Sequence, residues 1–269
     1  MRFIKWLVWS AAAITLASLL FIILFIFIKG IGSLNWGLFD IQYTSTNISM
    51  MPAIISTLII VGLALLIAAP IGIFTGFYLV EYADRSSKVL SIIRLATDTL
   101  AAVPSIVYGL FGMLFFVYQL GTGYSHYAGI FTVTIMILPI IISSTEEALL
   151  SVNNDLRMGS LALGAGKLRT IFTVVLPVAM PGILSGLILA TGRIVGETAA
   201  LLYTLGSSSG LLKGLASSGR TLAVHMYVLS QEGLHVNEAY ATAAVLIVLV
   251  LIINALSTYI GRKLSSGGK

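Results

Sequence analysis

Long stretches without charged residues alternate with short polar segments along the chain. Five stretches contain no Asp, Glu, Lys or Arg, at residues 6–28, 41–80, 99–145, 170–192 and 239–261. The third is interrupted at 121–126 by a glycine-rich polar segment, which indicates a turn between two antiparallel helices. The second begins with polar residues at 42–49, which we interpret as a loop. A membrane-spanning helix needs about 20 apolar residues, so the pattern predicts six spans.

We expect a single all-α domain over residues 1–269, a polytopic membrane bundle whose six helices lie at about 7–28, 53–79, 101–120, 128–145, 174–203 and 239–260. The first run follows two basic residues, as a signal peptide would. A signal peptide has a shorter apolar region of about 7 to 15 residues and a small-residue cleavage site. We therefore interpret this run as an uncleaved first span.

Composition supports a membrane protein. Hydrophobic residues make up 58% of the 269 residues and charged residues only 9%, whereas soluble proteins carry about 25% charged residues. The chain has no cysteine, which excludes disulfides and cysteine-ligated metal sites.

The basic residues orient the six-span arrangement. Lys29, Lys213 and Arg220 fall on one side. The other side, which also holds both termini, carries Arg2, Lys5, Arg85, Lys88, Arg94, Arg157, Lys167, Arg169, Arg262, Lys263 and Lys269. Basic residues concentrate in cytoplasmic loops, so both termini are predicted to be cytoplasmic.

Several kinds of catalytic chemistry are not encoded. The chain has no Gly-x-x-x-x-Gly-Lys-Ser/Thr nucleotide-binding loop, and its three histidines fall in predicted outer loops without other evident metal ligands. Residues 206–210 match the Gly-x-Ser-x-Gly pattern of a nucleophilic serine, but that pattern works on a strand-to-helix turn. Here it follows a predicted membrane helix and indicates a flexible linker.

The fifth predicted span carries two charged residues, Arg193 and Glu197, and their spacing of four would place them on one helical face. Charges at this depth are costly and face a bundle interior or a wet path. One interpretation is an ion pair that locks helices together, beside the small residues Gly182 and Gly186. The other is that the guanidinium meets an anionic substrate and exchanges it for Glu197. Residue types alone leave both open.

Residues 146–173 form the most unusual loop. Charged residues alternate with regularly spaced leucines, and the Gly164-Ala165-Gly166 break predicts a helix, a turn, a short helix and a return to the membrane. Such a helical pair either lies on the bilayer or docks into another protein.

The segment 160–166 (SLALGAG), followed by 174–177 (VVLP), is similar to the coupling loop of ABC importer permeases. The resemblance places Gly164 at the family's glycine and implies ATPase contact through Ser160, Ala162, Leu163, Gly164, Ala165 and Gly166. The Glu-Ala-Ala of that loop falls on residues 158–160, where this chain has Met-Gly-Ser, so its acidic residue is absent.

Two further segments, 101–111 (AAVPSIVYGLF) and 193–199 (RIVGETA), resemble permeases of the phosphate-specific system. Segments 79–83 (LVEYA) and 221–227 (TLAVHMY) resemble PstA-type subunits rather than PstC-type partners. The resemblance extends over residues 52–262.

The resemblance implies a transmembrane subunit that translocates inorganic phosphate. The implied partners are a PstC-type second permease, PstB-type ATPase subunits that bind ATP, and an extracytoplasmic PstS-type binding protein. The expected location is a bacterial or archaeal cytoplasmic membrane. No cofactor is expected in this chain, and neither catalysis nor a nucleic-acid partner.

The resemblance favours the path interpretation for Arg193, Glu197 and Thr198. Arg220 matches a basic position near the entrance only loosely, and a solvated loop charge explains it equally well. A permease for sulfate, molybdate or phosphonate would share these features. A membrane scaffold or an intramembrane enzyme would instead use Arg193 and Glu197 for packing or chemistry.

The topology is tested by alkaline phosphatase fusions, which are active only outside the cytoplasm. A fusion within residues 206–219 should be active and one within 153–167 inactive, because the basic residues place these loops on opposite sides. The reverse pattern would contradict the orientation.

Overall fold

The computed structural model describes residues 2–84 and 87–266, and these residues form helices joined by loops, without a strand. The all-α expectation is confirmed. Arg85 and Lys269, two basic residues used to orient the chain, lie outside the described residues. The elements are α1 (Arg2–Ile31), η1 (Trp36–Phe39), α2 (Met51–Phe77), η2 (Tyr78–Tyr82), α3 (Lys88–Ala102), α4 (Ser105–Gly112), η3 (Met113–Gln119), α5 (His126–Leu150), α6 (Asn154–Ala162), α7 (Lys167–Thr170), η4 (Ile171–Val175), α8 (Leu176–Val195), α9 (Ala199–Thr204), α10 (Leu222–Glu232) and α11 (Val236–Ser266).

Among the described residues, five helical segments are long and apolar enough to cross a membrane: Phe3–Ile31, Met51–Tyr82, His126–Leu150, Lys167–Val195 and Val236–Tyr259. A sixth candidate is the pair Lys88–Ala102 and Ser105–Gln119, which is bent by 100° at its break. Proline disfavours helical backbone in the residue before it, and Val103 before Pro104 is extended (φ −67°, ψ 129°). The helix expected at 101–120 therefore begins at Ser105.

α2, α5 and α8 pack closely because glycines remove side chains at their contacts. A Cβ on Gly72 of α2 would lie 2.7 Å from Ile141 Cγ2 of α5. On a neighbouring face of α5, a Cβ on Gly186 of α8 would collide with Ser144, and one on Gly182 would lie 2.6 Å from the Ala148 Cβ. The small face predicted on the fifth span is thus a helix contact.

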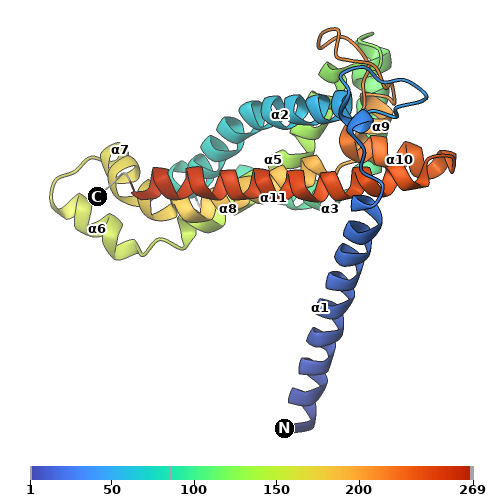
Figure 1. Ribbon diagram of the computed structural model, residues 1–269. Coiled ribbons are helices and arrows are strands. Elements are labelled where there is room, and N and C mark those ends of the chain that lie inside the picture. Colours follow the sequence, from blue (N-terminus) through green and yellow to red (C-terminus); the bar gives the residue numbers. More distant parts are fainter. Residues whose placement is uncertain (1, 85–86, 267–269) are drawn as a thin grey trace.

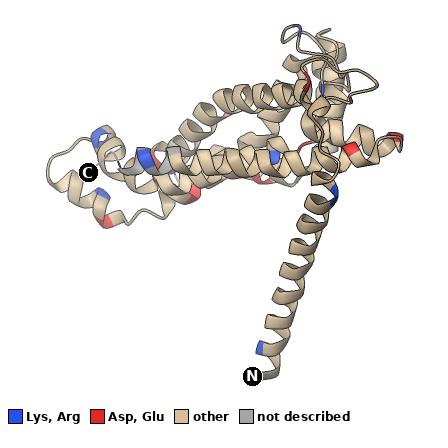
Figure 2. Ribbon diagram, in the orientation of Figure 1, with Lys and Arg blue, Asp and Glu red and all other residues tan. Residues whose placement is uncertain are grey.

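α1 projects away from the other long helices, while α6 and α7 lie at one end of the molecule and α9 and α10 at the other (Figure 1). Near its C-terminal end α1 contacts α11, where the rings of Phe25 and Tyr240 meet edge to face at 5.9 Å. The charged residues concentrate toward the ends of the long helices, whose middle parts are largely uncharged (Figure 2). This distribution fits helices surrounded by hydrocarbon.

Candidate functional site

The predicted fifth span is interrupted between its two charged residues. α8 ends at Val195 and α9 begins at Ala199, so Arg193 and Glu197 do not lie on one continuous helix. Glu197 is 7% exposed, and its Oε1 accepts a hydrogen bond from the backbone N–H of Ala200 at 3.0 Å. Of the two interpretations, the ion pair between Arg193 and Glu197 is not formed in this structure. The helix ends between the two residues, and the carboxylate satisfies the start of α9 instead.

Arg193 occupies the last turn of α8 and is half-buried. Its Nε atom is enclosed by protein and has no hydrogen-bond partner. An enclosed donor without a partner costs free energy unless a ligand or water satisfies it. A guanidinium presents several donors in one plane, a geometry that suits a carboxylate, phosphate or sulfate group. The arrangement leaves Arg193 available to an oxyanion.

A second helix interruption lies beside the first. α4, which follows the bend at Pro104, packs against α9 through Gly109, where a Cβ would lie 2.8 Å from the Ala200 Cα. Thr198 is half-buried at the N-cap position of α9. Non-helical backbone at membrane depth is stable only inside protein or along a wet cavity, and transporters build substrate sites at such interruptions.

Arg220 lies apart from this site, in the loop that leads into α10. It is only 5% exposed, and its guanidinium carbon lies 4.9 Å from the centre of the Tyr43 ring. The interpretation of Arg220 as a solvated loop charge is therefore wrong. Its Nη2 atom is buried without a partner. The structure does not bring Arg220 together with Arg193 and Glu197.

Two histidines expected in outer loops are instead fully buried. His126 begins α5, and its ring nitrogens contact Ser56 Oγ at 3.1 Å and the Ser217 carbonyl at 2.7 Å. His225 lies in α10, beside the Tyr43 ring. Burial and the neighbouring charge of Arg220 lower the pKa of His225 to about 3. Sequence reasoning missed both because their partners are distant in the chain.

The loop between α5 and α8 has the predicted order of helix, turn and short helix. Gly164 ends α6 in a left-handed conformation (φ 83°), with its N–H bonded to the Leu161 carbonyl and the Ala165 N–H bonded to the Ser160 carbonyl. This pair of bonds forms the Schellman motif, which favours glycine at that position. Beyond the turn, Gly166 occupies the N-cap position of α7.

The turn is presented outward. Leu163, which follows Ala162 at the end of α6, is 91% exposed, and Met158 on α6 is 59% exposed. Charged side chains would be expected on a helix that faces water alone. Exposed apolar residues at a turn of fixed shape suit docking into another protein.

Solved structures with the same fold are ABC importers. A bacterial alginate ABC transporter, crystallised with a periplasmic protein that holds an alginate pentasaccharide, matches with a TM-score of 0.65 at 15% identity, over 96% of this chain and 95% of that chain. The inward-facing MetNI methionine ABC transporter matches with a TM-score of 0.55 at 18% identity, over 91% of this chain and 97% of that chain. The fold is that of a type I ABC importer permease.

Residues 68–266 match the family described as binding-protein-dependent transport system inner membrane component. The chain belongs to this family. It is therefore a non-catalytic, multi-pass inner-membrane subunit of a transport system that depends on a binding protein.

Curated relatives make the match narrower. The probable ABC transporter permease protein YqgI of Bacillus subtilis is 34% identical over 93% of this chain and 91% of its own length. The phosphate transport system permease protein PstA of Haemophilus influenzae is 35% identical over 84% of this chain and 81% of its own length. The PstA homolog of Mycoplasma pneumoniae is 34% identical over 93% of this chain but only 39% of that longer protein. These relatives confirm the resemblance to PstA-type permeases.

The conformation of Gly164 predicts a sharp substitution pattern. Gly164→Val should abolish transport while the protein remains in the membrane, since a β-branched residue is strongly disfavoured at positive φ. Gly164→Asn should keep most of the transport, because asparagine tolerates this conformation. Uptake by membrane-verified variants measures both. Normal transport by Gly164→Val would contradict a docking role for the turn.

The buried His225 predicts loss of stability in acid. A histidine in an unfolded chain has a pKa of about 6.5, so below that pH the unfolded chain binds a proton at His225. In the folded chain the pKa of His225 is about 3, and the ring stays unprotonated. The free energy of unfolding should therefore fall as the pH falls from 6.5, by about 2 kcal/mol at pH 5. Thermal unfolding in detergent at pH 7 and pH 5 measures this difference.

His225→Asn should reduce the acid sensitivity, whereas His235→Asn, at a half-exposed histidine before α11, should retain it in full. The buried His126 contributes to the remaining sensitivity. Equal acid sensitivity of His225→Asn and the wild type would contradict the attribution of this destabilisation to His225.

Proposed function

We propose that this chain is the PstA-type permease subunit of an ATP-driven importer of inorganic phosphate. The proposal rests on relatives whose names specify phosphate transport, at 34 to 35% identity over 84 to 93% of the chain. One observation links that function to a site: Arg193 has an enclosed, unpartnered donor at the interruption between α8 and α9.

Arg193 would lower the barrier for a doubly charged oxyanion that crosses the membrane. Two parallel hydrogen bonds from one guanidinium match two oxygens of a tetrahedral anion. Glu197 would act indirectly, since its carboxylate is engaged with the first turn of α9. It fixes the backbone interruption that holds Arg193, and its engagement there leaves the guanidinium free for the anion.

Transport also needs the partners. We propose that PstB-type ATPases bind the α6–α7 turn on the cytoplasmic side, that a PstC-type permease completes the path, and that a PstS-type protein delivers phosphate from outside. Both termini would then be cytoplasmic. ATP-driven movement of the turn would switch the bundle between its inward-facing and outward-facing states.

Another oxyanion remains the alternative substrate. Sulfate, molybdate or a phosphonate would satisfy the same guanidinium, and the fold is shared by importers of unrelated solutes. Competition by excess unlabelled sulfate or molybdate during uptake of radiolabelled phosphate separates these substrates. Inhibition by either competitor would point to that anion.

The Arg193 series tests the path. In cells that lack only this chain, Arg193→Gln should reduce phosphate uptake by roughly tenfold to a hundredfold relative to wild type, the loss expected for a charge-assisted hydrogen-bond pair of about 1.5 to 3 kcal/mol. Arg193→Lys should recover little of this uptake, because an ammonium group lacks the planar fork.

Lys213→Gln is the matched control, since that outer-loop lysine is exposed and its variant should transport normally. Full uptake by both Arg193 variants would remove the residue from the mechanism. Absence of wild-type phosphate uptake, with other high-affinity systems deleted, would contradict the substrate.

A further inference from the structure

The short segment η2, at the end of α2, receives side chains from both helices of the coupling loop. η2 (Tyr78–Tyr82) is a π-helical turn continuous with α2. Glu81 of this turn pairs with Arg157 of α6, and the neighbouring Tyr82 lies under Lys167 of α7, whose Nζ is 4.5 Å from the ring centre. π-helical turns occur frequently at functional sites.

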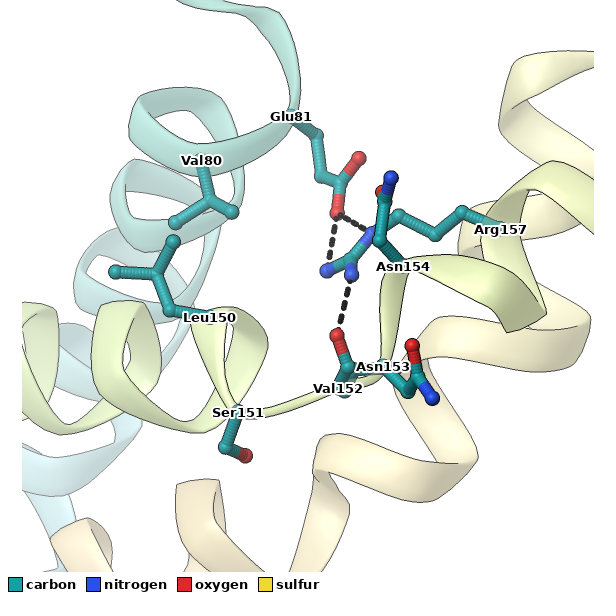
Figure 3. Close-up of a pocket in the computed structure, with 8 residues that line it drawn as sticks. All are labelled: Val80, Glu81, Leu150, Ser151, Val152, Asn153, Asn154 and Arg157. Atoms are coloured by element: carbon teal, nitrogen blue, oxygen red, sulfur yellow. Dashed lines mark hydrogen bonds and ion pairs between the residues drawn. The ribbon is translucent and has the colours of Figure 1, made fainter.

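The Arg157 guanidinium joins three segments (Figure 3). Its Nε and Nη2 atoms both lie 3.1 Å from Glu81 Oε1. Nη1 donates to the Val152 carbonyl and Nη2 to the Leu149 carbonyl, each at 2.7 Å. Arg157 therefore connects α6 to the end of α2 and also satisfies carbonyls at the end of α5, where a helix leaves acceptors unpaired.

The ion pair is largely enclosed, with side chains 16% exposed at Arg157 and 10% exposed at Glu81. Pairs of this kind hold geometry more strongly than exposed ones, because loss of one partner leaves a poorly hydrated charge behind. The pair borders a cavity of about 560 Å³ that is also lined by Asn153 and Asn154. A substitution of similar size at Glu81 would therefore remove charge without crowding.

α6 and α7, the two helices of the coupling loop, also contact each other. Ser160 Oγ of α6 and Thr170 Oγ1 of α7 are 2.9 Å apart. α6, α7 and η2 are thus linked in a closed set of contacts, so a displacement of the turn at Gly164 acts on η2 from two directions.

α2 extends from η2 to the opposite end of the molecule. Its 27 residues extend about 40 Å at 1.5 Å per residue. At the far end Ser56 Oγ contacts His126 Nε2 at 3.1 Å, and Thr57 Oγ1 accepts a hydrogen bond from the Leu222 backbone N–H at 2.9 Å. α2 and its continuation η2 therefore contact the coupling loop at one end and the first residues of α5 and α10 at the other.

We infer that Glu81 and Arg157 are positioning residues for transport: their ion pair stays closed through the cycle and transmits movement of the coupling helices to α2. The inference rests on ATP-driven import by this chain, and only its transport readout assumes the phosphate substrate. The chain offers a matched control, since Arg94 of α3 pairs with Glu146 of α5 near the same end without involving α6.

The test uses the complete reconstituted transporter and measures phosphate moved per ATP hydrolysed. Glu81→Gln and Arg157→Gln should each lower this ratio about tenfold while the ATPase subunits still copurify. The double variant should be no worse than Arg157→Gln alone, because Arg157→Gln already removes the ion pair together with the two carbonyl contacts. Glu146→Gln should keep the wild-type ratio. An unchanged ratio in Glu81→Gln, or an equal loss in Glu146→Gln, would overturn the inference.

The absence of native cysteine permits a rescue experiment. Glu81→Cys with Arg157→Cys should be uncoupled, and a bifunctional thiol reagent that bridges the two positions should restore transport per ATP. Cross-linked protein that remains uncoupled would show that the contact must open during the cycle, which contradicts the inference.

A readout without any solute separates this inference from the substrate proposal. A Thr46→Cys thiol in the exposed outer loop before α2 should change its reaction rate with an impermeant maleimide when ATP is added. The change should be lost when Glu81→Gln is also present. If the ATP-dependent change in reaction rate persists in Glu81→Gln, the proposed role of the Glu81–Arg157 ion pair is contradicted whatever solute is transported. Absence of wild-type phosphate uptake contradicts only the substrate proposal.

Discussion

The need to satisfy backbone hydrogen bonds away from water governs this structure. Continuous helices meet it along most of each span, and each interruption must be compensated locally. Glu197 does so where α8 gives way to α9. Arg157 does so where α5 ends, by binding the Leu149 and Val152 carbonyls. Two of the costliest residues for an apolar protein are thus placed where the backbone is irregular, and each also determines how neighbouring segments are held.

Hydrophobic patterning was sufficient for the all-α fold and for the break at Gly164, because both follow from local sequence. It could not reveal that the helix stops between Arg193 and Glu197. Spacing arguments assume a continuous helix, and the one local signal for its end, the C-cap residue Gly196, is weaker than a proline. Pro104 was such a signal, yet it lay inside an uncharged stretch and was included in a span. The side-chain partners of His126 and Arg157, Ser56 and Glu81, lie 70 and 76 residues away in the sequence, beyond any local pattern.

The two regions proposed to act in transport differ in construction. At Arg193 an enclosed donor is left without a partner. Around Arg157 the guanidinium donors engage a carboxylate and two carbonyls. An uncommitted cation suits transient contact with a passing anion, whereas a fully engaged one suits force transmission. The same residue type therefore serves opposite purposes according to how many acceptors the fold supplies.

The exposure of Leu163 at the α6–α7 turn has a consequence for the cell. A leucine that is 91% exposed on a turn of fixed shape presents an apolar surface to the solvent unless another protein covers it. If the proposed ATPase docks there, a newly made subunit without its partner would offer that same surface to chaperones and proteases. Assembly and degradation would then compete for one turn.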